Sequence, residues 1–197
     1  VIANLANKKL TGKLGTNSPV HPNDHVNKSQ STNDSFPSAI NIATAILVKD
    51  SLIPSMKRIQ TTLKSHSKKW DKIIKVGRTH LQDATPLSLG QEFSGYEAMI
   101  SSNIKRVEQS FNSLLNLAQG GTAVGSGLNT KKNFDKFVVS EISKISKIKF
   151  KPAINKFQAL AAHDAIVEIS GSLNVLTTDL FKIANDIRLL GSGPRSG

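Results

Sequence analysis

A heptad seam in the last third of the sequence places the tightest constraint on the fold. Its apolar side chains recur with spacings that alternate strictly between three and four residues: Ile166, Ile169, Leu173, Leu176, Leu180, Ile183, Ile187 and Leu190. This period keeps one narrow stripe of a long helix facing a partner helix. Such a helix cannot bury its stripe alone, so the spacing predicts antiparallel neighbours in a bundle.

Three further segments carry a helical period. Their apolar stripes are Phe93, Tyr96, Ile100, Ile104, Val107, Phe111, Leu114 and Ala118; Ala45, Val48, Leu52, Met56, Ile59 and Leu63; and Phe134, Phe137, Val138, Ile142 and Ile145. Pro54 lies inside the second stripe, and we expect it to kink that helix without ending it. We interpret the leucines and isoleucines of these stripes as core residues.

The sequence favours an all-α fold, a long antiparallel helix bundle. Signals for extended structure are weak, and residues 73–76 alone suggest a short strand. No apolar run approaches the roughly 20 residues that cross a bilayer, so we expect no membrane partner. The sequence does not begin with methionine, and residues 191–197 read as a connecting loop, so we expect the chain to be clipped at both ends.

The formal net charge of +12 is the one outlier in composition. Such a charge is typical of nucleic-acid binding, of attraction for an anionic substrate, or of a lysine-rich solvated surface. The lysines are scattered and are not interleaved with aromatic residues, which make up only 5% of the chain. We therefore favour the solvated surface and expect no nucleic-acid partner. The absence of cysteine excludes disulfides and thiolate metal sites.

Polar segments separate the helical stripes, and one of them precedes a helix that should begin near Ser35. Residues 29–34 read Ser-Gln-Ser-Thr-Asn-Asp. One such side chain is enough to cap a helix. A cluster of hydroxyls and amides at a helix N-terminus also favours an anion, because the backbone N–H groups and the helix dipole attract negative charge. The residues alone leave both interpretations open.

Two other polar segments contain histidine. In residues 20–25, two histidines flank a turn-forming proline and lie near Asp24; metal binding is conceivable there, but a surface turn is the better interpretation. In residues 77–86, His80 follows Thr79 among polar neighbours that can tune its charge, which makes it a candidate acid–base residue. Residues 119–129 hold four glycines, which permit positive φ and close backbone approach.

Taken together, these blocks resemble the signatures of the fumarase/aspartase superfamily. The first block is residues 21–34, the second is residues 77–93, and the third is residues 120–129, continued by residues 155–164 and on to Arg195. The Thr79–His80 pair favours the class II fumarate hydratase family, because the similar aspartate ammonia-lyases usually carry glutamine at the position of His80.

The resemblance implies a lyase of the tricarboxylic acid cycle that hydrates fumarate reversibly to (S)-malate. It assigns proton transfer to His80 and substrate binding to Ser31, Thr32, Asn33 and Thr79, with a second, peripheral dicarboxylate site at His21, Pro22, Asn23 and Asp24. We expect no metal and no cofactor.

The resemblance also implies an assembly and a location. Residues 1–34 would be the C-terminal part of an N-terminal lyase domain, and residues 35–197 a truncated central helical-bundle domain. The family forms homotetramers whose active sites are shared between subunits. Members occur in the bacterial cytoplasm or the mitochondrial matrix. The alternatives are an aspartate ammonia-lyase-like enzyme, a basic helical binding module without catalysis, and a purely structural bundle, which leaves the polar blocks unexplained.

The resemblance predicts that the 197-residue chain by itself is inactive. The family's serine–lysine loop, which supplies a base and a substrate ligand, is expected beyond Gly197, and a Ser-Gly-Thr segment before Val1. We expect the purified chain to give no change in fumarate absorbance above the rate without protein. Measurable hydration by this chain alone would contradict the prediction.

Overall fold

The computed structural model describes residues 1–195; residues 196–197, which end the predicted bundle domain, lie outside the described residues. The helices are α1 (Ile2–Thr11), α2 (Thr32–Leu47), α3 (Ile53–Lys69), α4 (Leu89–Leu114), α5 (Phe134–Ser146), α6 (Lys156–Ala161) and α7 (Asp164–Leu190), with π-helical turns η1 (Pro22–Val26) and η2 (Val48–Leu52). The strands are β1 (Ile74–Thr79), β2 (Gln82–Ser88), β3 (Asn116–Leu117) and β4 (Lys151–Pro152). The predicted all-α class is confirmed.

The chain divides into two compact units, each with its own buried residues. Unit 1 comprises residues 1–46 and 114–164. Unit 2 comprises residues 47–113 and the chain from Ala165 onward.

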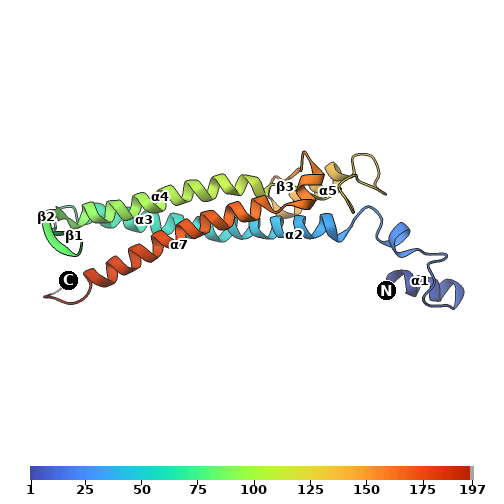
Figure 1. Cartoon of the computed structure of the whole chain (residues 1–197), viewed down its shortest axis with the longest axis horizontal. Coiled ribbons are helices and arrows are strands. Elements are labelled where there is room, and N and C mark those ends of the chain that lie inside the picture. The colour runs from blue at the N-terminus through green and yellow to red at the C-terminus, as the bar shows by residue number, and fades with distance from the viewer. Residues whose placement is uncertain (196–197) are drawn as a thin grey trace. The chain divides into compact units, whose positions relative to one another are not determined.

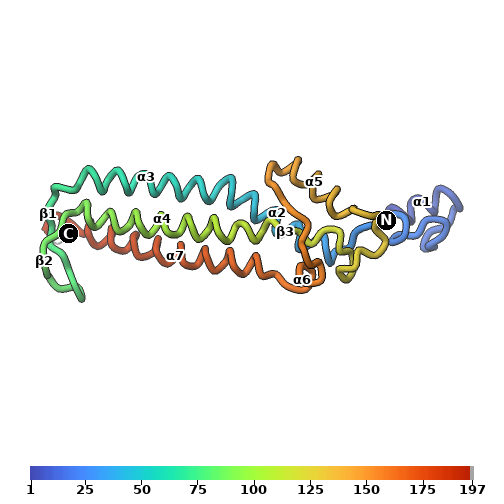
Figure 2. The backbone as a smooth tube through the Cα atoms, turned by 90° about the horizontal axis from the view of Figure 1, so that it is seen from above, coloured from blue at the N-terminus to red at the C-terminus, as the bar shows by residue number. Residues whose placement is uncertain are grey.

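Unit 2 is a bundle of three long helices. Figures 1 and 2 both show α3, α4 and α7 side by side, with α4 running antiparallel to the other two. The core consists of Met56, Leu63, Phe93, Tyr96, Ile100, Ile104, Val107, Ile169, Leu176 and Ile183. Each large apolar side chain buried in this way contributes about 1.5–3 kcal/mol. The bundle predicted from the helical stripes is therefore confirmed.

The heptad seam of α7 consists of two rows of apolar residues, each with a spacing of seven, and the buried residues lie in one row. Ile169, Leu176 and Ile183, seven residues apart, are 2–6% exposed. Ile187, in the other row, is 45% exposed, and Phe181 beside the seam is 71% exposed. The helix thus has more apolar surface than this chain covers.

Pro54 does not end its helix, as the sequence predicts. It stands in the first turn of α3, directly after the π-helical turn η2. A proline lacks the N–H that would bond one turn back, and a widened turn accommodates the loss. The helical path resumes through Lys69, so the residue interrupts the regular α-helix without ending it.

The helical stretch Thr32–Lys69 corrects one sequence expectation. It is 38 residues long and contains a window that is long and apolar enough to cross a membrane by length and composition alone. Polar residues such as Asn41 and Thr44 interrupt the apolar run and conceal this character in the sequence. The core helix of a soluble protein passes the same test, so one such helix is weak evidence for a membrane span.

In unit 1, α5 presents a different face to the core than its stripe predicts. Val139 is 1% exposed, whereas Phe137 and Ile145 are 69% and 84% exposed. Ile148 and Phe150, which follow the helix, are buried and extend this face. The prediction that Ile145 is a core residue was therefore wrong, because the helix turns its Val139 side inward.

The apolar stripe that ends at Ala118 extends beyond the C-terminal end of its helix, α4. Helix α4 ends at Leu114, and the chain continues as β3, which pairs in parallel with β4. The Lys151 N–H donates to the Leu115 carbonyl at 2.8 Å, and the Ala153 N–H donates to the Leu117 carbonyl at 2.9 Å. Ala118, the last residue of the stripe, is buried together with Leu117, but both residues lie beyond the end of the helix.

The polar segment from Gly77 to Pro86 forms a β-hairpin, which the sequence indicated only in part. Strand β1 pairs antiparallel with β2, from Ile74 opposite Ser88 to Thr79 opposite Gln82. The predicted short strand at residues 73–76 is the start of β1. Strand β2 is polar and contains Pro86, a residue that is uncommon within sheets, so its pattern did not predict a strand.

The start of α4 depends on a glycine. A Cβ at Gly90 would lie 2.3 Å from the Ser67 carbonyl oxygen and 2.6 Å from the Asp71 Cα. We expect Gly90→Ala to lower the free energy of unfolding by about 1–3 kcal/mol, because α3 must move away. Chemical denaturation measures this.

Gly95→Ala is the matched control, because a Cβ there meets nothing within 4 Å. On the same helix, alanine should raise the free energy of unfolding by up to about 1 kcal/mol. Equal effects of the two substitutions would contradict the packing described for Gly90.

Candidate active site

In unit 1, the polar block before α2 is organised by Asp34, which is fully buried. Its Oδ1 accepts the Ser31 N–H at 2.9 Å, while the Ser31 Oγ accepts the Asn33 N–H at 3.2 Å. These reciprocal bonds follow the logic of a capping box at the helix N-terminus. The capping interpretation of the block is confirmed.

The other oxygen of Asp34 holds the glycine-rich loop. Oδ2 accepts the backbone N–H groups of Gly120 and Thr122, each at 2.9 Å, and lies 3.4 Å from the Gln119 Nε2. An ionised carboxylate that accepts several N–H groups makes stronger hydrogen bonds than a neutral acceptor does. Asp34 therefore fastens residues 119–122 to the first turn of α2.

Further contacts join the same block to the same loop. The Asn33 Nδ2 donates to the Ala123 carbonyl at 2.8 Å, and the Ser29 Oγ donates to the Asn129 carbonyl at 3.1 Å. Thr32 is exposed, and no contact fixes its side chain among those described. The hydroxyl and amide groups of this block are thus partly fixed and partly free to meet solvent or a ligand.

A cavity of about 550 Å³ opens between the block and the loop. It is lined by Asn23, Asp24, Asn27, Ser29, Gln30, Ser31, Thr122, Ala123, Leu128 and Asn129. The Thr122 Oγ1 is buried and has no hydrogen-bond partner in the described part of the chain. The structure therefore brings the predicted peripheral residues Asn23 and Asp24 to the same cavity as Ser31.

The remaining peripheral residues form a turn, as the sequence predicts. His21 caps η1, and its Nδ1 accepts the N–H groups of Asn23 and Asp24, both at 3.2 Å. Pro22 is the first residue of that turn. The His21 Nδ1 also lies 3.3 Å from the Asp24 carboxylate. His21 and Pro22 do not line the cavity.

The glycine-rich loop makes the close backbone approach predicted for it. Gly120 has a φ of 94°, and a Cβ there would lie 2.5 Å from the Asp135 Cβ. Asp135 accepts from the Lys156 Nζ at 2.9 Å. Burial alone would raise the pKa of Asp135, but the hydrogen bond and charge of Lys156 outweigh it and hold the pKa below its usual value. An ion pair thus flanks the loop opposite Asp34.

In unit 2, Thr79 and His80 lie at the tip of the β1–β2 hairpin. His80 and Leu81 are the two residues between the paired Thr79 and Gln82, and both have positive φ, 53° and 64°. Two-residue turns of this kind favour asparagine and glycine, because a Cβ makes positive φ costly. A histidine and a leucine held there are a local strain of the type that gathers at functional sites.

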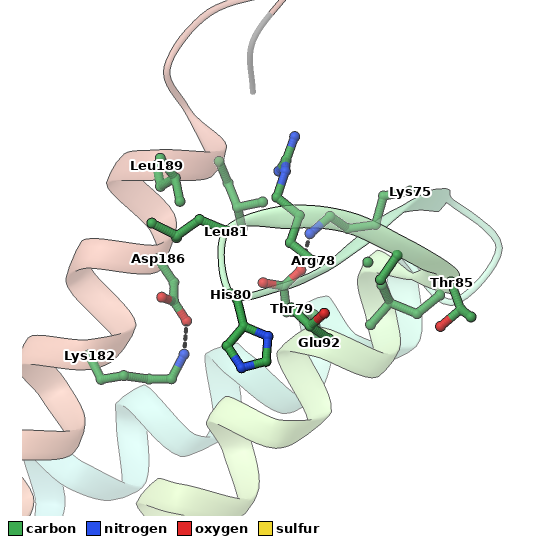
Figure 3. A pocket seen from close by; sticks show the side chains of 14 residues that line it. Lys75, Arg78, Thr79, His80, Leu81, Thr85, Glu92, Lys182, Asp186 and Leu189 are labelled. Carbon is green, nitrogen blue, oxygen red and sulfur yellow. Dashed lines mark hydrogen bonds and ion pairs between the residues drawn. The ribbon is translucent and has the colours of Figure 1, made fainter.

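A second cavity, of about 560 Å³, lies beneath this hairpin (Figure 3). It is lined by Lys75, Gly77, Arg78, Thr79, His80, Leu81, Ala84, Thr85, Leu87, Glu92, Lys182, Asp186, Leu189 and Leu190. Figure 3 shows the His80 side chain pointing from the hairpin into the cavity. The site offers a histidine, hydroxyl groups and charges of both signs.

The structure thus forms two clusters, one in each unit. Ser31, Asn23 and Asp24 line the cavity of unit 1, and Thr79 and His80 line that of unit 2. Within residues 1–195, no three histidine or carboxylate side chains gather as metal ligands. Both clusters contain hydrogen-bond donors that can bind anionic oxygens, and the cluster of unit 2 adds the imidazole of His80, which can transfer a proton.

Sequence reasoning missed the role of two buried polar residues near the unit 1 cavity, Asp34 and Thr122. Asp34 was visible only as the last polar residue of the block. Its partners follow it by 86 and 88 residues, and no local pattern connects them.

A lyase family profile matches residues 2–197. The chain is 59% identical over its whole length to the class II fumarate hydratase of Rickettsia conorii and 57% identical to the mitochondrial fumarate hydratase of Schizosaccharomyces pombe. It covers 42% and 38% of these relatives, so it spans about two fifths of their length. The predicted resemblance to class II fumarate hydratases is therefore confirmed.

A solved structure agrees with these sequence matches. The class II fumarase of Schistosoma mansoni superposes with a TM-score of 0.86 at 38% identity, over all of this chain and 44% of that one.

The hydrogen bonds of Asp34 predict a large effect of its removal. Asp34→Ala leaves the N–H groups of Ser31, Gly120 and Thr122 without their acceptor, at about 1–3 kcal/mol for each one that stays buried. We expect the free energy of unfolding to fall by about 3 kcal/mol or more in chemical denaturation.

Asp24→Ala is the control, because that side chain is 69% exposed and its polar contact within residues 1–195 is with His21 of its own turn. It should change the free energy of unfolding by about 0.5 kcal/mol or less. An Asp34→Ala variant as stable as this control would show that the loop does not depend on Asp34.

Proposed function

The chain belongs to the lyase family, and from that premise we propose that the protein carrying it adds water reversibly to fumarate to give (S)-malate. The observation that carries this proposal is the sequence identity of 54–59% with eight fumarate hydratases, which extends over the whole chain. The proposed place of the reaction is the tricarboxylic acid cycle.

The chemistry of this reaction accounts for the residue types of both clusters. In the direction from malate, a proton leaves the carbon beside one carboxylate, and its electron pair spreads into that carboxylate as an aci-carboxylate. Hydroxide then leaves the neighbouring carbon and takes up a proton to become water, which gives fumarate. Donors placed in advance stabilise the extra charge, because they need no rearrangement as it forms.

We assign these roles to particular residues. Ser31, Thr32, Asn33 and Thr79 donate hydrogen bonds to the substrate carboxylates, and His80 moves the proton, through a water and with a second group. His80 is exposed at the tip of its turn, where a ligand and water both reach it. Asn23 and Asp24, with His21 and Pro22, remain the candidates for a peripheral dicarboxylate site.

We propose that the two clusters meet between subunits of a homotetramer. Two observations support this. The clusters belong to different units of one chain. In addition, α7 carries apolar side chains that the chain does not cover, with Val167 and Phe181 each at least 70% exposed. Uncovered apolar surface on a long helix is typical of a face buried by another subunit.

The compartment and the domain division remain predictions. The relatives include proteins of bacteria and proteins named mitochondrial, so we propose the bacterial cytoplasm or the mitochondrial matrix. We likewise retain residues 1–34 as part of an N-terminal lyase domain and residues 35–197 as part of a central helical bundle.

Substituting the proposed proton-transfer residue tests the function directly. In the complete protein, we expect His80→Asn to lower kcat for fumarate hydration by about 10²–10⁴-fold, the usual contribution of general acid–base catalysis. The KM should change little, because the hydroxyl and amide donors remain. Loss of fumarate absorbance with formation of malate is the assay.

His163→Asn is the matched control, because this exposed histidine precedes α7 and lines neither cavity. It should retain kcat within about twofold. Release of ammonia from aspartate by the wild-type protein, without malate formation from fumarate, would instead identify an ammonia-lyase. Full activity of His80→Asn would refute the assigned role.

A further inference from the structure

Five charged or hydroxyl-bearing side chains meet beneath the β1–β2 hairpin, from three separate elements. Lys75 comes from β1, Glu92 and Tyr96 from the first turns of α4, and Lys182 and Asp186 from the end of α7. We call these five residues the hairpin clamp. Figure 3 shows the Lys182–Asp186 pair of α7 and the Lys75–Glu92 pair on either side of His80.

The clamp is a continuous chain of polar contacts. Lys75 forms an ion pair with Glu92, and Lys182 forms one with Asp186. The Tyr96 hydroxyl joins the two pairs, because its oxygen lies 2.9 Å from the Glu92 Oε1 and 3.0 Å from the Asp186 Oδ2. The Lys182 ammonium also lies 5.7 Å from the centre of the Tyr96 ring. Two positive and two negative charges therefore balance around one phenol.

Partial burial makes the contacts of Tyr96 and the Lys75–Glu92 pair stronger than ordinary surface pairs, whereas Lys182 is 52% exposed. Tyr96 is 2% exposed, and the side chains of Lys75 and Glu92 are each 20% exposed. Burial, followed by the hydrogen bonds to Glu92 and Asp186, raises the pKa of Tyr96 above its usual value, so the hydroxyl stays protonated. Removing Lys75 or Glu92 leaves the other as a poorly solvated charge without its partner, which is costly.

The hairpin needs such an anchor. An isolated two-stranded hairpin is marginally stable, and this one also carries the positive φ of His80 and Leu81 at its tip. The ion pair between Arg78 and Asp83 joins the two strands to each other and ties them to no helix. Lys75, by contrast, connects the strand that ends at Thr79 to α4.

We propose that Tyr96 and the two ion pairs it joins are positioning residues that hold the hairpin against α4 and α7, so that Thr79 and His80 keep one place toward a bound dicarboxylate. This inference rests on the proposed hydration of fumarate for its kinetic consequence. Its structural consequence, a hairpin held in place, is independent of that reaction.

The test uses the complete protein with Lys75→Met, Glu92→Gln and the double variant. A displacement of about 1 Å at a catalytic group can lower a rate by about 10²-fold, so we expect each single variant to lose at least about tenfold in kcat. The double variant should lose no more than the single variants, because one contact is removed in all three. Lys75→Arg, which keeps the charge, should retain kcat within about threefold.

The matched control is the Lys57–Glu108 pair of the same unit, which joins α3 to α4 at 3.2 Å and whose side chains are 56% and 46% exposed. Lys57→Met and Glu108→Gln should leave kcat within twofold. Tyr96→Phe keeps the buried ring and removes only the hydroxyl, so it tests the clamp even if the charge variants fold poorly. It should also lower kcat by about tenfold.

Hydrogen exchange gives a measurement that does not depend on the reaction. The amides of residues 74–88 should exchange at least about tenfold faster in Lys75→Met and Tyr96→Phe, while those in the middle of α4 should not change. Faster exchange in a protein that does not hydrate fumarate would support the clamp and overturn the proposed function. Unchanged hairpin exchange, or wild-type kcat in both variants, would overturn the clamp.

Discussion

A buried carboxylate, Asp34, joins the first turn of α2 to a loop that follows it by 86 residues. Taking that charge out of water is unfavourable, and the structure offsets the cost with backbone N–H donors from Ser31, Gly120 and Thr122. The same bonds determine where the polar block lies. Because Asp34 faces inward, Ser31 lines a cavity on the other side, together with Asn23 of the preceding turn. The cavity of unit 1 is therefore a consequence of how one charge is satisfied.

Unit 2 uses a larger set of charged residues to fix the position of its polar hairpin. Its bundle core is apolar, but the end beneath the hairpin carries ion pairs joined by Tyr96. Apolar packing holds helices together without specifying a single position for a polar turn. Hydrogen bonds and ion pairs favour one position of the hairpin, because any other position would leave a charge there unpaired. The strained turn of His80 persists only because its surroundings determine it. In both units, polar residues that do not touch the candidate ligand decide where the residues that would touch it lie.

Sequence analysis predicts the features that repeat locally and misses those that depend on distant partners. The stripes of α4 and α7 span several turns, so their period of three to four residues identifies helix and core together. The stripe of α5 gave a wrong prediction for Ile145, which is 84% exposed because the helix turns its Val139 side inward. Strand β2 was missed because Pro86 and polar neighbours conceal it. The residues marked Ser31 and His80 as candidates and the resemblance supplied their roles, whereas Asp34 and Tyr96 act through partners 86 and 90 residues away.

We propose that the block fixed by Asp34 and the turn holding His80 receive one dicarboxylate between them. A crystal structure of the complete protein with a bound four-carbon dicarboxylate tests this arrangement. We expect carboxylate oxygens within hydrogen-bond distance of Ser31 or Asn33 from one subunit, and of Thr79 or His80 from another, in a shared cleft. A ligand bound elsewhere, with the two clusters in separate clefts in every pairing of subunits, would contradict it.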